Sequence, residues 1–151
     1  MSRKPAELQN HPVGFEHAKA VGLYRAACQH VVDGDTADFL VDLGLYHYAY
    51  IALRVMGVDT PELVGVPAAV REAGLAAKAR TEALLLHRPA LLDTHREKRS
   101  FERFIGRVWL PHPNDLAGPT DTFRTLKVGD TLFVDLADVL IAEGHGQPVP
   151  G

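Results

Sequence analysis

Hydrophobic and polar residues alternate along the first third of the chain with the period of two that is typical of β-strands. Ala37, Phe39 and Val41 alternate with two aspartates and a leucine, which predicts a half-buried strand. The Asp33-Gly34 pair before this segment is a turn signal, and the segment after it is rich in aromatic and β-branched residues. Three consecutive strands are therefore predicted, at residues 24–32, 36–42 and 46–56.

The period lengthens to that of an α-helix at residues 67–87, which are rich in alanine. Because a glycine inside a helix costs about 1 kcal/mol relative to alanine, we expect the regular helix to begin near Gly74. The apolar positions that share one predicted helical stripe are Leu75, Ala79, Ala83 and Leu86. A further strand and a short amphipathic helix are predicted at residues 104–110 and 134–143.

This order of elements predicts an α+β protein, a five-stranded OB-type β-barrel with two to three helices. One helix lies between the third and fourth strands, as in that barrel type. We expect residues 1–22 to form an N-terminal arm, residues 23–146 the folded domain and residues 147–151 a tail. Residues 111–130 form a Pro/Gly/Asp-bearing insertion for which no element is predicted.

The composition narrows the class of protein. A chain of 151 residues with 46% hydrophobic and 23% charged residues is long enough for one domain with its own core. The single cysteine excludes an internal disulfide framework, and the eight histidines include no H-x-x-x-H pair typical of zinc sites. No secretory signal or transmembrane segment is visible, so we expect a cytoplasmic protein without a membrane partner. The sequence does not determine the oligomeric state, for which a monomer is our expectation.

Acidic residues gather at the turn after the first predicted strand. In the segment VVDGDT, Asp33 and Asp35 flank a glycine. Hard cations take several oxygen ligands, which carboxylates on a tight turn can supply. An ordinary Asp-Gly turn uses the same residues, so this segment alone leaves both interpretations open.

A second group of charged residues lies in LRVMGVDTPEL, residues 53–63. Arg54 is near the end of a predicted strand, where burial of its charge requires a partner or an anion. Asp59 and Glu62 follow on a loop that Pro61 restricts, which suits a loop that must hold carboxylates in place. A structural role, with Asp59 capping the turn and Glu62 in solvent, is the alternative.

A third segment is locally basic although the chain has a formal charge of −3. Residues 94–107 carry five basic and two acidic side chains, which indicates either a solvated loop or an anion-binding region. Arg103 and Arg107 point to the same side of a strand, and a guanidinium group matches phosphate oxygens. Phosphodiester hydrolysis needs a cation, guanidinium donors and a group that activates water. The three segments together predict that reaction.

The chain also resembles the staphylococcal nuclease (thermonuclease) family over about residues 23–146. The resemblance is carried, in order, by VVDGDT, LRVMGVDTPE, the alanine-rich helix, SFERFIGRVWL and LADVLIAEGH. It implies the barrel fold and a Ca²⁺-dependent nuclease that acts on DNA and RNA with broad sequence tolerance. The implied partner is a DNA or RNA substrate, with single-stranded or locally unpaired regions favoured.

The resemblance also implies roles for individual acids. Asp35 and Asp59 match the two metal-binding aspartates, and Thr60 matches the residue whose backbone carbonyl binds the metal. Asp33 resembles the additional acid near the metal. Glu62 matches the glutamate that activates or orients the attacking water.

Two arginines are implied as phosphate ligands. Arg54 matches the first. For the second, the family has an aromatic residue, a glycine and an arginine, and the frame FER selects Arg103 with Glu102 at the usual glycine position. The alternative frame IGR keeps the glycine and selects Arg107, but it spoils the hydrophobic alignment of the residues that follow.

Two other functions stay open at this point. A non-catalytic nucleic-acid-binding OB-type module would keep the fold without turnover, and a protein-interaction barrel would have no affinity for nucleic acid. Tyr46, Tyr48 and Tyr50 share a predicted strand face with Arg54, and they either pack the hairpin or stack on bases.

Overall fold

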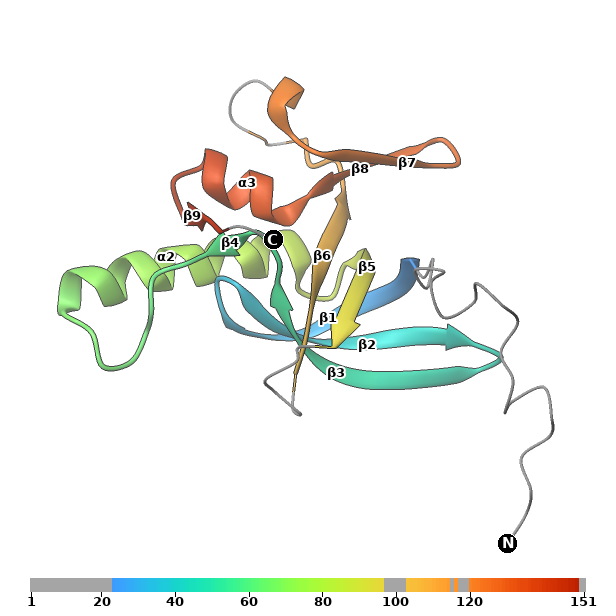
Figure 1. The fold of residues 1–151 in the computed structure, drawn as a ribbon, viewed down its shortest axis with the longest axis horizontal. Helices are drawn as coiled ribbons and strands as arrows, with labels where there is room; N and C mark the ends of the chain where they lie inside the picture. The colour runs from blue at the N-terminus through green and yellow to red at the C-terminus, as the bar shows by residue number, and fades with distance from the viewer. Residues whose placement is uncertain (1–22, 97–102, 115, 117–119, 150–151) are drawn as a thin grey trace, which may run out of the picture.

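A computed structural model describes residues 23–96, 103–114, 116 and 120–149 (Figure 1). For residues 95, 96, 103 and 120 it describes the backbone alone. The predicted N-terminal arm, residues 1–22, and Glu102 therefore lie outside the described residues, as does part of the insertion at residues 111–130.

Five strands close into a mixed β-barrel. Their order is β3-β2-β1-β5-β6, and β6 returns to pair with β3. The β3–β6 pair is parallel, whereas the other neighbours in the barrel are antiparallel. The strands are β1 (Leu23–Asp33), β2 (Thr36–Gly44), β3 (His47–Val55), β5 (Pro89–Arg96) and β6 (Arg103–Pro111). This architecture confirms the predicted α+β class and is compatible with an OB-like fold.

The remaining elements surround the barrel. Figure 1 shows both labelled helices on one side of it, while the β2–β3 hairpin projects away from them. The helix α2 lies between β3 and β5 in the chain, as predicted, and β8 extends the sheet beyond β6. These elements are β4 (Val58–Asp59), α2 (Ala68–Leu85), the 3-10 helix η1 (Thr120–Thr122), β7 (Thr125–Val128), β8 (Thr131–Asp135), α3 (Leu136–Ala142) and β9 (Gln147–Pro148).

The core fills the barrel and the space beneath the helices. The predicted inward face of β2 is confirmed, because Ala37, Phe39 and Val41 are all buried. Full burial of a large apolar side chain such as Phe39 stabilises the fold by about 1.5–3 kcal/mol. Leu53 and Val55 of β3 join the same cluster, so the pleat sends the residues between them outward.

The buried face of α2 differs from the prediction. The helix begins at Ala68 rather than near Gly74, and Leu75, Ala79 and Ala83 are exposed. The buried residues are Gly74, Ala77, Thr81, Leu84 and Leu85. The predicted stripe was wrong because the helix lies close against a loop and a turn, where a glycine and a threonine fit better than large apolar residues.

The bounds of β5 and α3 depend on contacts that the local sequence pattern does not include. The chain around residue 94, which the charge pattern assigned to a basic segment, lies in β5 because it pairs with both β1 and β6. The predicted helix at residues 134–143 begins only at Leu136, since Asp135 is its N-cap and accepts the N–H of Ala137. None of the helices in the described part of the chain combines the length and apolar character of a membrane span.

Candidate metal and phosphate site

The turn between β1 and β2 is fixed from three sides. The Asp33 carboxylate accepts the backbone N–H of Asp35 at 3.1 Å, which closes the turn. The Thr81 hydroxyl of α2 donates to the carbonyl of Gly34 at 2.8 Å. A Cβ atom at Gly34 would lie 2.8 Å from side-chain atoms of both Thr60 and Ala77. Glycine therefore allows the turn to fit against the loop after β4 and against α2.

Asp35 connects this turn to that loop. Its Oδ2 atom accepts the backbone N–H of Thr60 at 2.9 Å, and its Oδ1 atom accepts the Thr36 hydroxyl at 3.1 Å. The residue is only 3% exposed, so a polar group here requires such partners. Thr60 is also buried, and its hydroxyl is without a hydrogen-bond partner among the described residues.

Arg54 lies between two carboxylates. Its Nη2 atom donates to Oδ1 of Asp59 at 3.0 Å and lies 3.5 Å from Oδ2 of Asp35. Arg54 reaches the turn from β3 because Thr36 is its direct partner on β2. The Asp59 side chain is more than half exposed, whereas that of Asp35 is buried. The structure therefore brings together three of the residues that the sequence selected, with one side open to solvent.

The charges in this group influence each other. Burial and the neighbouring Asp35 carboxylate raise the pKa of Asp33 to about 6. Burial would also raise the pKa of Asp35, but hydrogen bonds from Asp33 and the Thr60 N–H, with the charge of Arg54, outweigh it and lower that pKa. Burial would lower the pKa of Arg54, and the two carboxylates reverse this, so the guanidinium group stays charged.

The carboxylate oxygens of this group are of the donor type that hard cations take. One carboxylate oxygen of Asp35 and one of Asp59 lie within 3.5 Å of the same nitrogen atom. Two ligands of one Ca²⁺ ion, each at about 2.3–2.6 Å, lie within about 5 Å of each other. No group of three or more His, Cys, Asp or Glu side chains arranged to hold a metal occurs among the described residues. A cation here would therefore take its other ligands from backbone carbonyls, water or substrate.

Glu62 lies on the loop that follows, at the exposed surface. Its backbone is held against α2, because a Cβ atom at Gly74 would lie 3.0 Å from the Glu62 carbonyl oxygen and 2.8 Å from that of Pro61. Its side chain forms no hydrogen bond or ion pair within the described part of the chain. The backbone of Glu62 is thus held against α2, while no contact within the described part of the chain fixes the direction of its carboxylate.

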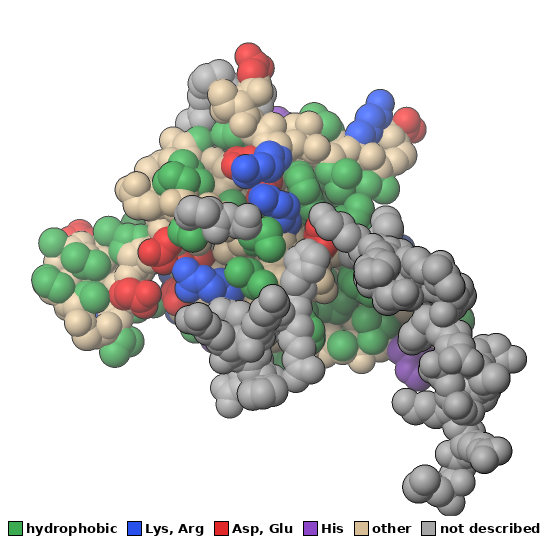
Figure 2. Space-filling model, in the orientation of Figure 1, with side chains coloured by type: hydrophobic (Ala, Val, Ile, Leu, Met, Phe, Trp, Pro, Cys, Tyr) green, Lys and Arg blue, Asp and Glu red, His purple; other side chains and the backbone are tan. Residues whose placement is uncertain are grey.

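For the two candidates for the second arginine, the structure describes the side chain of Arg107 but only the backbone of Arg103. The backbone of Arg103 lies opposite Ala52 on β3, and its side chain is outside the description. Arg107, in contrast, donates to the carboxylate of Asp135 at 2.7 Å. Figure 2 shows basic atoms bordered by acidic atoms at several places on one face, among them one level with β4 and α2 and one level with β8 and α3.

Sequence reasoning missed Asp135 and Thr81. Asp135 is completely buried, and burial raises its pKa while the Ala137 N–H and Arg107 oppose that shift. Its position before an amphipathic helix is an N-cap signal that could have revealed it. No local signal reveals Thr81, since its partner Gly34 lies far away in the sequence.

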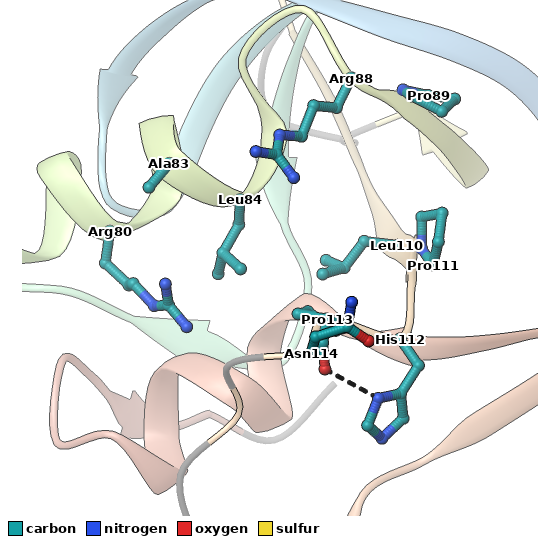
Figure 3. A pocket seen from close by; sticks show the side chains of 10 residues that line it. All are labelled: Arg80, Ala83, Leu84, Arg88, Pro89, Leu110, Pro111, His112, Pro113 and Asn114. Carbon is teal, nitrogen blue, oxygen red and sulfur yellow. Dashed lines mark hydrogen bonds between the residues drawn. The ribbon is translucent and has the colours of Figure 1, made fainter.

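A separate cavity of about 570 Å³ lies between the end of α2 and the chain after β6 (Figure 3). Its lining includes Arg80 on α2, Arg88 between α2 and β5, and His112 beyond β6. The guanidinium group of Arg80 binds both carboxylate oxygens of Glu143, at 2.7 and 2.8 Å, which ties α2 to the end of α3. The acids and arginines of the candidate site are not part of this cavity.

Comparison of the sequence with known proteins finds no matching family model and no matching curated protein.

Proposed function

We propose that this protein hydrolyses phosphodiester bonds in DNA, RNA or both, with Ca²⁺ as its cofactor and with broad sequence tolerance. The proposal follows the resemblance to the staphylococcal nuclease family. The observation that supports it most is the convergence of the Asp35 and Asp59 carboxylates on Arg54, at one open edge of an OB-like barrel. Cation ligands and a phosphate ligand are the groups that this reaction needs side by side.

Each residue has a defined role in this proposal. The carboxylates of Asp35 and Asp59 and the backbone carbonyl of Thr60 hold the cation, which supplies Lewis-acid polarisation of the phosphate when bound. Arg54 exchanges its carboxylate partners for phosphate oxygens as negative charge develops on them. Glu62 takes a proton from the attacking water.

Arg103 supplies the second guanidinium group from β6, the strand beside Arg54. All of these contacts go to phosphate, metal or water. Because none of them reads a base edge, cleavage depends little on sequence.

A nucleic-acid-binding barrel without turnover is the second candidate. It is favoured by the partners of Arg54, which already neutralises both carboxylates as it would in a structural ion pair. In that case the guanidinium group would stay with the acids, and binding would rest on basic surface residues.

A cleavage assay separates these functions. Purified protein is incubated with single-stranded DNA, double-stranded DNA or RNA in Ca²⁺, in Mg²⁺ or in excess chelator, and Asp59→Asn serves as the control for contaminating nuclease. Ca²⁺-dependent cleavage that disappears in Asp59→Asn is the expected result. Salt-sensitive binding without cleavage in any metal would favour the binding module. If the protein neither binds nor cleaves nucleic acid, the protein-interaction barrel is the remaining interpretation.

A further inference from the structure

The β2–β3 hairpin exposes an unusual number of aromatic and apolar side chains. Tyr46, Tyr48 and Tyr50 are 96%, 59% and 62% exposed, and Leu45 at the tip is 91% exposed. The tyrosines are therefore mostly exposed to solvent, although Tyr50 lies opposite Leu40 on β2. Exposed apolar and aromatic side chains that gather on one hairpin commonly mark a site of interaction.

The tip of the hairpin supports the same conclusion. Leu45 and Tyr46 have φ angles of 55° and 60°. Hairpin turns with this left-handed conformation favour asparagine and glycine, because a larger side chain is strained there. Two bulky apolar residues at these positions are unfavourable for folding alone, and their full exposure gives no compensation within the described chain.

Tyr48 and Tyr50 lie on the face of β3 that leads to the candidate site, whereas Tyr46 lies in the turn before this strand. Ala49 and Ile51 alternate with these two tyrosines, and Ile51 packs against the core. The pleat therefore directs Tyr48, Tyr50 and Arg54 to the same outer face. Four residues of strand span about 13 Å, so Tyr50 lies a few nucleotides from Arg54.

This face carries charges that are compatible with a polyanion. Its two aspartates on β2 are both paired, Asp42 with Arg25 at 3.6 Å and Asp38 with His30 at 3.3 Å. The cation of the first pair is largely exposed. Asp42 therefore has a cation close by, and Asp38 has one when His30 is protonated, which reduces the repulsion that an approaching phosphate backbone meets.

We propose that Tyr46, Tyr48 and Tyr50 form a stacking platform for the bases of single-stranded nucleic acid whose phosphate lies at Arg54. This inference rests on the proposed function and names its substrate class. Aromatic side chains in a row bind successive bases without reading their identity, since every base has a flat face. Base-paired DNA would keep its bases stacked on each other and away from the tyrosines.

The test compares binding and cleavage as the substrate lengthens. Fluorescence anisotropy in chelator measures the affinity for a labelled ten-nucleotide oligothymidylate, and initial rates in Ca²⁺ compare this oligomer with a dinucleotide. The variants are Tyr48→Ala/Tyr50→Ala and the conservative Tyr48→Phe/Tyr50→Phe. Val128→Ala/Leu132→Ala, which removes exposed apolar side chains from the β7–β8 hairpin, is the matched control.

We expect the alanine pair to weaken oligomer binding by about tenfold or more, while the phenylalanine pair and the control bind like wild type. The alanine pair should also lose the advantage in initial rate that the ten-nucleotide substrate has over the dinucleotide. Wild-type binding by the alanine pair would overturn the inference and leave the proposed hydrolysis intact. Binding that depends on the tyrosines without any cleavage would uphold the platform and contradict the hydrolase. A wild-type protein that binds no oligomer would overturn both.

Discussion

Asp35 accepts the backbone N–H of Thr60 at 2.9 Å, across 25 residues of sequence. This single hydrogen bond joins the β1–β2 turn to the loop that carries the other candidate site residues. Because both residues are buried, it determines the position of Thr60 as well as the stability of the loop. The site is therefore assembled by the packing of a turn against a loop, and α2 holds the two together.

Replacement of Asp35 by alanine should lower the free energy of unfolding and abolish cleavage. The change leaves the Thr60 N–H without its acceptor and removes a partner of Arg54, so we expect a loss of about 1–3 kcal/mol in the free energy of unfolding. Urea denaturation followed by circular dichroism measures it.

Asp59→Ala is the matched comparison. Its side chain is more than half exposed, so its ion pair with Arg54 contributes little and stability should change by less than about 0.5 kcal/mol. Cleavage should nevertheless be lost, because a cation ligand is gone. Equal destabilisation by the two substitutions would contradict the packing described for Asp35.

Gly74→Ala should destabilise the protein although helix propensity predicts the opposite. Alanine is favoured over glycine by about 1 kcal/mol inside a helix. The new Cβ atom would, however, lie 2.8 Å from the carbonyl oxygen of Pro61, a backbone atom that cannot move without the loop. Ala76→Gly, at an exposed position of the same helix, measures the propensity effect separately. A Gly74→Ala variant more stable than wild type would show that α2 and the loop are not in close contact.

The choice between Arg103 and Arg107 can be decided by variants that keep the fold. Arg107→Ala removes the closer cation of the buried Asp135 carboxylate and leaves Arg124 at 3.9 Å, so stability should fall by up to about 3 kcal/mol and the activity of this variant alone is uninformative. The double variant Arg107→Ala/Asp135→Asn also removes the buried negative charge and keeps an N-cap residue on α3. If Arg103 is the second phosphate ligand, Arg103→Ala lowers the rate of cleavage strongly and the double variant cleaves nearly normally. The reverse pattern would select Arg107.

Local sequence patterns were sufficient to predict an element and its buried face where neighbouring residues determine them. The alternation of Ala37, Phe39 and Val41 predicted both the strand and its buried face. The short segments around Asp35 and Asp59 also contained the residues that the fold brings together, because each segment carries its own turn signals.

Local patterns failed where a distant partner determines the outcome. The buried face of α2 depends on how closely Gly74 approaches a loop, and periodicity cannot report that distance. Arg107 pairs with Asp135 on a different strand. The choice between the frames FER and IGR used only the hydrophobic alignment of nearby residues, so it could not take this pairing into account. The strand β5 forms because β1 and β6 both pair with it.

Cys28 should make stability depend on pH in alkaline solution. Burial raises the pKa of its thiol to about 11, and the side chain has no exposed surface. In the unfolded chain the thiol ionises near pH 8.5, so between about pH 8.5 and 11 the unfolded state loses a proton that the folded state keeps. The free energy of unfolding therefore falls as the pH rises through this range.

Urea unfolding of wild type and Cys28→Ala at pH 7, 9 and 10.5 measures this contribution. The variant should show a smaller decline than wild type. The thiol of the folded protein should also react slowly with an aromatic disulfide reagent at pH 8. Rapid reaction of the native protein would show that Cys28 is accessible.

The most direct test of the account is the rate at which Glu62→Gln cleaves single-stranded DNA at saturating Ca²⁺. Glu62 has an exposed side chain, so the substitution should leave stability within about 0.5 kcal/mol of wild type. Loss of its proton-accepting carboxylate should slow cleavage by about 100-fold or more, with DNA binding unchanged. Cleavage by Glu62→Gln at the wild-type rate would contradict the proposed site.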